Sequence, residues 1–295
     1  MHHITFQAYI LKYPSSKTTN RKSLADHKKQ IIKRYLKGES SEILSSEYKC
    51  ATSSICRLLK KAKVTRPMSL SKRRYLINEE YFDKIDTEGK AYFLGLLYAD
   101  GYNSESKRAI VLTLHKKDIG ILVKLNKDIG SNKPLRTETG LYYKLIIENK
   151  HLSEALSFLG CMQAKTFKIL FPANKIVPDY LSHHFMRGYF DGDGYISKDT
   201  NSSQAMSITS NELFAFEYRK HLEDNCNLSP TKLYRYKNSK IVTVTYGGRN
   251  QLCRIYNFLY KDATFFLQRK KNRFLNIAKG RHLINRYLFT EKIDV

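Results

Sequence analysis

Two segments of the sequence place an aspartate in the same setting of glycine and aromatic residues. The first, "FLGLLYADGYNS", contains Asp100 before Gly101, and the second, "FMRGYFDGDGYIS", contains Asp193 before Gly194. Two carboxylates that meet in space can hold a divalent cation, since Mg²⁺ prefers one or two carboxylates together with waters and phosphate oxygens. The chemistry therefore depends on whether the fold brings these two aspartates together.

The second segment also invites comparison with a calcium-binding loop. An EF-hand loop needs oxygen ligands at its positions 1, 3 and 5 and a glycine at position 6. Counted from Asp191, the fifth and sixth positions are Tyr195 and Ile196, and the first segment has Tyr98 in place of a leading aspartate. These mismatches argue against a calcium loop.

Both segments have the small residues of a helix that packs closely against another helix. Gly95 and Ala99 are four residues apart, as are Gly188 and Gly192, so each pair lies on one helix face. Small residues on such faces let two helix backbones approach each other closely. We expect the two segments to form helices that pack as a pseudo-twofold pair.

Each aspartate would then lie in the last turn of its helix. We expect Gly101 and Gly194 to end the two helices, at a position where a positive φ is easiest for glycine. Helix C-termini carry partial negative charge, so Asp100 and Asp193 would repel each other unless one kept its proton or a cation bound between them. In a strongly basic chain, a metal between paired carboxylates indicates hydrolysis of phosphodiesters. The alternative is that both aspartates only form turns.

The residues after the two segments repeat one order of elements. The strand-like "AIVLTLHKKD" and the hairpin-like "LRTETGLYYKLIIEN" follow the first segment, each with a helix-like stretch after it. The strand-like "QAMSITSN" and the hairpin-like "TKLYRYKNSKIVTVTYGG" follow the second in the same way. This order predicts a duplication in which each repeat runs helix, strand, helix, two strands, helix, with a further strand possible directly after the aspartate.

The part of the chain before the repeats contains three short helical patterns, over residues 26–66. The last of them, "ATSSICRLLKKAK", turns apolar residues inward and its basic residues outward. Three short helices with a basic last helix match a helix-turn-helix domain that inserts this helix into a major groove. The alternative is a small helical bundle with a solvated basic face. We expect residues 1–25 to form a flexible basic arm and residues 67–78 a cationic linker.

The composition favours a nucleic-acid partner. The chain has 52 Lys and Arg against 27 Asp and Glu, a net charge of +25, and such an excess binds polyanions by releasing their counterions. The five scattered cysteines form no C-x-x-C pair, which argues against a zinc ribbon and a disulfide framework. Because no membrane span or signal peptide is evident, we expect a soluble, intracellular protein, in the cytoplasm of a bacterial or phage-infected cell or in an organelle.

The paired segments "FLGLLYADG" and "FMRGYFDGDG" resemble the two motifs that give the LAGLIDADG homing endonucleases their name, in the single-chain form. The resemblance covers residues 79–279 and includes "KTFKILFPANKIVPDYLSHHF" and "LYKDATFFLQRKKNRF" as connecting and closing segments. It implies an α+β fold of two αββαββα repeats, residues 79–178 and 179–295, whose sheets form a DNA-binding saddle. Tyr98 and Arg187 depart from the motif, at positions that concern helix packing.

The resemblance also implies a function and its site. Asp100 and Asp193 would bind Mg²⁺, or Mn²⁺ in its place, and a monomer would cut both strands of a long double-stranded DNA target, as in intron homing. Lys150 and Arg249 are our candidates for the basic catalytic residue of each repeat. The predicted DNA contacts are Arg57, Lys60, Lys61, Lys72, Arg73, Arg74, Lys116, Tyr142, Lys144, Arg235, Lys237 and Lys271. The alternative is a non-cleaving protein of the same fold, which binds DNA or acts as an RNA maturase.

Overall fold

The structure is a computed structural model that describes residues 21–64, 75–104, 106–137, 139–162, 168–198, 203–237 and 239–279. The chain divides into two compact units, Met1–Leu76 and Ile77–Val295. Among the described residues, none of the helices has both the length and the apolar character needed to cross a membrane.

The first unit is a small helical domain. Its helices are α1 (Arg21–Asp26), α2 (Lys28–Leu36), α3 (Ser41–Glu47) and α4 (Thr52–Lys61). Ile31, Leu44, Ile55 and Leu59 form its buried core. The Ser40 hydroxyl accepts the Ile43 N–H at 3.2 Å and so caps α3.

Ion pairs of Arg34 link two of these helices. The Arg34 guanidinium of α2 contacts the Glu39 carboxylate at 2.6 Å and the Glu47 carboxylate of α3 at 2.5 Å. The prediction of an arm over residues 1–25 is wrong at its end, where the first helix, Arg21–Asp26, begins. Residues 1–20 of that arm, and residues 67–74 of the predicted linker, lie outside the described residues.

The second unit consists of two copies of one αββαββα course. The first copy comprises α6 (Glu88–Asp100), β1 (Gly101–Ser104), β2 (Ala109–His115), the short 3₁₀ helix η1 (Lys116–Asp118), α7 (Ile119–Asp128), β3 (Arg136–Thr137), β4 (Tyr142–Glu148) and α8 (Lys150–Phe158). The second comprises α9 (Asp179–Asp193), β5 (Tyr195–Ile196), β6 (Ala205–Asn211), α10 (Glu212–Cys226), β7 (Tyr234–Arg235), β8 (Ile241–Gly247) and α11 (Arg249–Tyr260), and α12 (Gln268–Lys279) follows it. The α+β duplication predicted from the sequence is confirmed.

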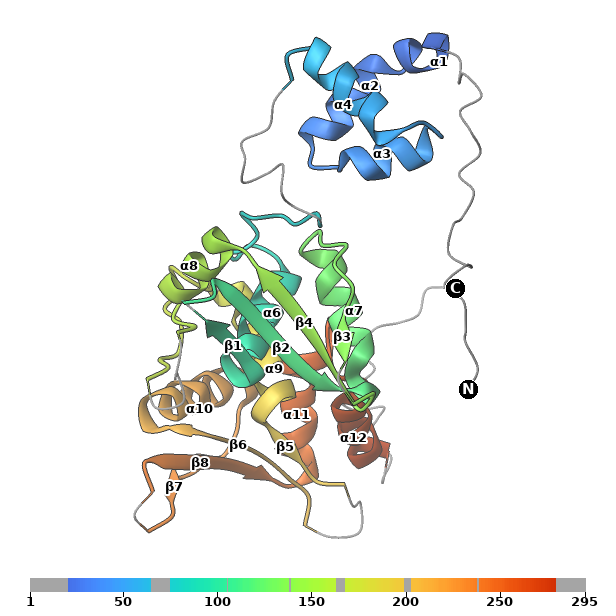
Figure 1. Cartoon of the computed structure of the whole chain (residues 1–295). Coiled ribbons are helices and arrows are strands. Elements are labelled where there is room, and N and C mark those ends of the chain that lie inside the picture. The colour runs from blue at the N-terminus through green and yellow to red at the C-terminus, as the bar shows by residue number, and fades with distance from the viewer. Residues whose placement is uncertain are drawn as a thin grey trace, which may run out of the picture. The chain divides into compact units, whose positions relative to one another are not determined.

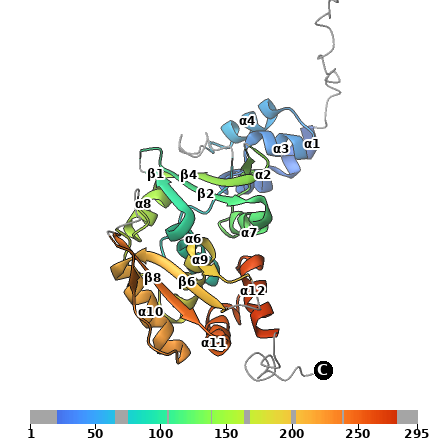
Figure 2. The same ribbon diagram turned by 90° about the horizontal axis from the view of Figure 1, so that it is seen from below.

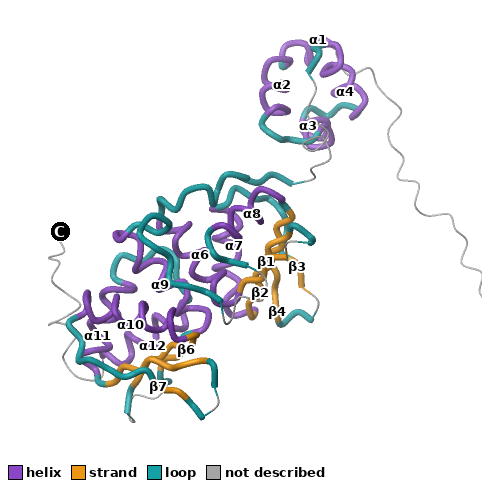
Figure 3. Tube along the Cα trace, turned by 90° about the vertical axis from the view of Figure 1, so that its left-hand side faces the viewer, coloured by secondary structure: helices purple, strands orange, loops and turns teal. Residues whose placement is uncertain are grey.

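Each copy folds its strands into one antiparallel sheet. The strand orders are β1-β2-β4-β3 and β5-β6-β8-β7, so the two sheets have the same topology. Figure 3 shows the strands of both sheets along one side of this unit and the helices along the other. Alternate residues of β4 and β8 are buried against these helices, as expected for a sheet with one covered face.

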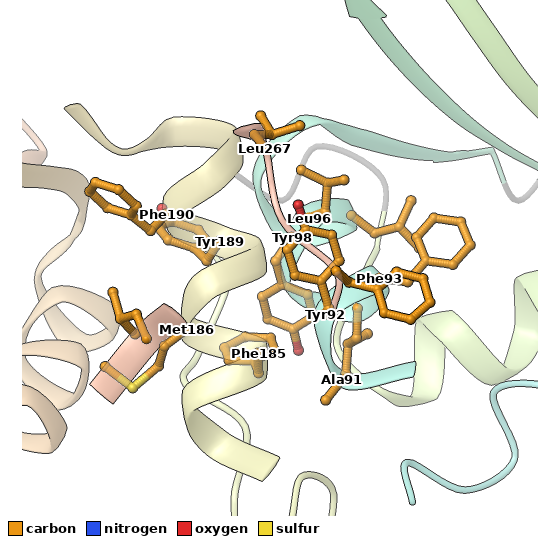
Figure 4. Packing of buried hydrophobic residues seen from close by; sticks show 14 of the residues in the cluster. Ala91, Tyr92, Phe93, Leu96, Tyr98, Phe185, Met186, Tyr189, Phe190 and Leu267 are labelled. Atoms are coloured by element: carbon orange, nitrogen blue, oxygen red, sulfur yellow. The ribbon is translucent and has the colours of Figure 1, made fainter. Parts of the chain in front are cut away.

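The two motif helices form the centre of the second unit. Figures 1 and 2 both show α6 and α9 side by side between the two sheets. Their side chains belong to one continuous hydrophobic core, in which the rings of Tyr98 and Phe185 meet edge to face with their centroids 5.1 Å apart. Figure 4 shows this packing between the two helices.

Candidate active site at the ends of two packed helices

The backbones of α6 and α9 touch at two glycines, as the spacing of small residues predicts. A Cβ added to Gly95 would lie 2.0 Å from the Phe185 carbonyl oxygen. A Cβ added to Gly188 would lie 2.1 Å from the Tyr92 carbonyl oxygen. Because real Cβ atoms do not approach backbone this closely, only glycine allows the two helices to pack at this distance.

The two aspartates end these helices and remain exposed. Asp100 is the last residue of α6 and Asp193 the last residue of α9. A Cβ added to Gly192, the residue before Asp193, would lie 3.2 Å from an Asp100 carboxylate oxygen. Burial raises the pKa of Tyr189, and both carboxylates add to that effect, Asp193 before Asp100. Both carboxylates therefore act on the Tyr189 hydroxyl, and the Asp100 carboxylate lies against the residue before Asp193.

The glycines after the aspartates do not adopt the conformation that we expected. Gly101 and Gly194 have φ of −78° and −74° with ψ of 152°, which is extended backbone. A Cβ on Gly101 would lie 2.6 Å from the Leu97 carbonyl oxygen. Steric closeness to the preceding turn, rather than a positive φ, therefore explains glycine at this position.

Lys270 of α12 lies beside the aspartates, in a place that the sequence did not predict. Its side chain is 2% exposed, and its ammonium donates to the carbonyl oxygens of Phe190 and Gly194, the latter at 2.5 Å. Burial lowers the pKa of Lys270 to about 8, against the opposing effect of Asp191 and of the two exposed aspartates. Lys270 thus places a cation at the C-terminal end of α9, where the helix dipole favours it.

Asp191, the first aspartate of the second motif, has a structural role. Its carboxylate is fully buried and accepts hydrogen bonds from the Tyr92 hydroxyl at 2.8 Å, the Tyr260 hydroxyl at 2.6 Å and the Leu267 N–H at 2.7 Å. Burial raises the pKa of Asp191, while Lys270 and these donors oppose the change. Asp191 therefore joins α9 to α6 and to the segment that leads into α12.

Arg187 also joins the two repeats, which agrees with its predicted role in helix packing. The guanidinium is completely buried. It donates to the Glu88 carboxylate of α6 at 2.7 Å, to the Phe265 carbonyl at 2.7 Å and to the Leu259 carbonyl at 2.6 Å. The ring of Tyr92 lies 5.4 Å from its guanidinium carbon. The hydrogen bonds that the guanidinium donates offset the free-energy cost of removing this ion pair from water.

The structure places Lys150 and Arg249, the predicted basic catalytic residues, away from the aspartates. The residue before Lys150 bonds to the Arg108 carbonyl at the far end of the first sheet from Gly101. Three to four strand residues, roughly 10–14 Å, separate those two ends. Arg249 occupies the matching place in the second repeat, where its Nε donates to Gln204 Oε1 at 3.0 Å. Lys270 is the basic side chain that the structure places beside the aspartates.

The strand registers decide which predicted DNA contacts face away from the helices. Tyr142 and Lys144 lie on the uncovered face of the first sheet, because Leu145 and Ile147 fill the covered one. The prediction for Arg235 is corrected, since it pairs with the buried Val242 and lies on the helix side of the second sheet.

The surroundings of the other basic residues follow from their contacts. The Arg235 guanidinium contacts the Glu212 carboxylate of α10 at 2.5 Å, and the Lys271 ammonium lies 4.1 Å from the centroid of Phe266. Besides Arg235, the exposed basic residues of the prediction that the structure describes are Arg57, Lys60, Lys61, Lys116 and Lys237. Lys72, Arg73 and Arg74 lie outside the described residues.

The two aspartates are the type of ligand for the magnesium that the sequence resemblance implies. Their side chains are exposed carboxylates, which are the hard oxygen ligands that Mg²⁺ prefers. Within the described ranges, no cluster of three or more His, Cys, Asp or Glu side chains is suited to hold a metal. Asp100 and Asp193 would therefore hold the ion together with oxygens from water and from a bound phosphate, rather than in a complete protein cage.

The family comparison agrees with this geometry. A family model described as "LAGLIDADG-like domain" matches residues 182–257, which run from α9 into α11. The matched residues lie in the second repeat, and the resemblance found in the sequence is confirmed for this part of the chain. No curated protein matches the sequence.

The solved structures to which this chain is similar include a homing endonuclease and a WhiA protein. The I-SmaMI LAGLIDADG homing endonuclease bound to cleaved DNA is 12% identical, with 66% of this chain and 89% of that chain covered at a TM-score of 0.45. Full-length DUF199/WhiA from Thermatoga maritima is 18% identical, with 72% of this chain and 68% of that chain covered at a TM-score of 0.41.

Proposed function

We propose that this protein is a site-specific DNA endonuclease that makes a staggered double-strand cut with Mg²⁺ or Mn²⁺. The observation that carries the proposal is that Asp100 and Asp193 each end one of two helices whose backbones touch. A bound cation there would neutralise charge on the scissile phosphate and make water a better nucleophile. Water forms a new bond to the phosphorus as one P–O ester bond breaks, and the leaving sugar oxygen takes up a proton to become a hydroxyl group, so that the other fragment keeps a phosphate monoester.

The protein's own groups have separate tasks in this proposal. Asp100 and Asp193 each serve chiefly one strand, because each belongs to one repeat and each repeat has its own sheet. Lys270 keeps a cation beside the carboxylates and offsets negative charge that gathers when phosphate enters. Arg187 and Glu88 hold the two helices in register, so that both carboxylates stay at one place.

The first unit would add affinity through α4. Arg57, Lys60 and Lys61 are exposed on this helix while Ile55 and Leu59 are buried. A short basic helix that follows two others, here α2 and α3, is the arrangement by which helix-turn-helix domains enter a major groove. We therefore assign α4 to DNA contact and expect its removal to weaken binding more than cleavage of bound target.

Selection of cleaved sites from a randomised plasmid library tests the proposal. The full chain with Mg²⁺ should enrich one long site, and no cut products should form when Mg²⁺ is omitted. The matched control is the Asp100→Asn/Asp193→Asn double variant, which keeps the shape of both side chains and should bind without cutting. Cutting by the double variant would contradict the proposal, as would tight binding of structured RNA with no cleavage of any duplex.

A further inference from the structure

A cavity of about 320 Å³ lies at the opposite end of α9 from its aspartate. Its walls come from the segment before α9, from the first turn of that helix and from the middle of α10. Ser182 lines the cavity, and Asp193 is the last residue of the same helix. The rise of an α-helix places the two residues about 16 Å apart along its axis. The cavity is therefore separate from the candidate active site.

The inner wall of the cavity carries a hydroxyl group without a partner. Ser182 is 6% exposed, and its hydroxyl makes no hydrogen bond to another residue that the structure describes. A buried polar group left unpaired costs free energy, and nearly all such groups in proteins have a partner. The hydroxyl therefore marks a place where a polar group of a ligand would bind.

Two carboxylates make the cavity acidic in a chain whose net charge is +25. Glu217 of α10 is half-buried and forms no ion pair within the described ranges. Asp179 begins α9, where the Asn174 amide donates to its Oδ2 at 2.8 Å and its own N–H donates to Asn174 Oδ1 at 3.0 Å. No lysine or arginine is among the described residues that line the cavity. This charge favours a cation and opposes an anion.

The remaining walls are suited to a hydrocarbon chain. The rings of Phe171 and His221 stack with their centroids 4.5 Å apart, and the buried Val177 also lines the cavity. A binding site for a small molecule typically has such an apolar lining with a few polar groups that fix its orientation. A metal ion does not suit the cavity, since the described residues contain no group of three or more His, Cys, Asp or Glu that could hold one.

We propose that this cavity binds an aliphatic polyamine. One ammonium group contacts the Glu217 carboxylate and donates to the Ser182 hydroxyl, and a second contacts the Asp179 carboxylate. The methylene chain between them packs on Phe171 and Val177. The inference does not depend on the endonuclease function proposed above, because the cavity is remote from Asp100 and Asp193 and requires neither DNA nor Mg²⁺.

Calorimetric titration of the full chain with spermidine, without DNA or Mg²⁺, tests the inference. We expect saturable binding of one molecule per chain. The overall positive charge of the protein repels polycations, so general electrostatic attraction does not explain such binding. Butylamine, which has a single ammonium group, should bind at least about tenfold more weakly, since it lacks one charge-assisted contact. Added Mg²⁺ should not compete with spermidine.

Two substitutions in α10 form a matched pair. Glu217→Gln and Asp224→Asn each remove one negative charge, but Asp224 is exposed and does not line the cavity. Glu217→Gln should weaken spermidine binding at least about tenfold, whereas Asp224→Asn should leave it nearly unchanged. Ser182→Ala should also weaken binding about tenfold without loss of stability in urea, because no described residue bonds to that hydroxyl.

The outcomes that would overturn the inference are distinct from those that concern DNA cleavage. Absence of saturable binding would overturn it, as would equal losses in Glu217→Gln and Asp224→Asn. Displacement of spermidine by a lysine-rich peptide that binds more tightly would overturn it too, since the cavity would then hold a basic side chain of another polypeptide. None of these results bears on the roles of Asp100 and Asp193.

Discussion

Gly188 lies so close to Tyr92 that a Cβ on the glycine would be 2.1 Å from the tyrosine's carbonyl oxygen. The same relationship holds for Gly95 and Phe185 at 2.0 Å, so the two helices touch at two points related by the pseudo-twofold axis. Because both aspartates end these helices, their spacing depends on this contact.

Substitution of either glycine by alanine should therefore separate the helices. We expect Gly95→Ala to lower the free energy of unfolding by about 3 kcal/mol or more, since neither backbone can yield locally. Gly120→Ala is the matched control, because Gly120 lies in α7 and a Cβ there meets nothing within 4 Å. It should be neutral or stabilise by up to about 1 kcal/mol. Equal effects of both changes in urea unfolding would contradict this view of the interface.

Loss of the Arg187 guanidinium should weaken the packing between the two repeats and so lower the free energy of unfolding. Arg187→Met leaves the Glu88 carboxylate without its buried partner, at a cost of about 3–5 kcal/mol. Lys150→Met is the control, because Lys150 and its Glu154 partner are both exposed and such an ion pair contributes about 0–1 kcal/mol. Urea unfolding of the two variants compares the costs, and an Arg187→Met variant as stable as the control would show that the buried network contributes little.

His184 should make stability depend on pH. Its Nδ1 lies 2.9 Å from the Arg187 Nη1 and accepts from it, and burial, then Arg187, lowers the pKa of His184 to about 3 from 6.5. Between those values the unfolded chain binds a proton that the folded chain does not, so stability falls as the pH drops below 6.5. The loss from pH 7.5 to pH 5 should be about 2 kcal/mol for this group.

The variant His184→Gln isolates that contribution. Its amide oxygen can still accept the Arg187 hydrogen bond, but the side chain does not titrate. The difference in unfolding free energy between the two proteins should therefore change with pH below 6.5 and stay constant above it. A constant difference across the whole range would show that His184 keeps an ordinary pKa.

Lys270 should matter for cleavage while Lys150 should not. We expect Lys270→Met to reduce the rate of target cleavage by at least about tenfold, on the scale of losing a positioned charge near the scissile phosphate, with target still bound. Lys150→Met should cut at nearly the wild-type rate, because Lys150 contacts Glu154 at 3.6 Å at the remote end of the first sheet. Binding and single-turnover cleavage measured on the same target separate the two effects.

The sequence alone predicted the features that occur in both repeats. Gly95, Gly188, Asp100 and Asp193 stand in matching positions of two similar segments, and a local period of four residues places each glycine on a helix face. These predictions succeeded because each depends on neighbouring residues in the chain.

The features that the sequence did not predict depend on partners far along the chain. Arg187 and Glu88 are 99 residues apart, and Lys270 acquires its role only because α12 folds against the end of α9. The pattern "RKK" predicts lysines that are exposed to solvent, whereas Lys270 is buried and Lys271 is partly exposed in the structure. No local pattern distinguishes two adjacent lysines with such different surroundings.

The central claim is that both carboxylates are needed to cut two strands. The direct test is a time course of cleavage on a supercoiled plasmid that carries the selected target, with Mg²⁺, for the wild type, Asp100→Asn and Asp193→Asn. We predict that the wild type produces linear DNA and that neither variant does, although either can still nick one strand. Linear product from either variant at the wild-type rate would contradict the claim.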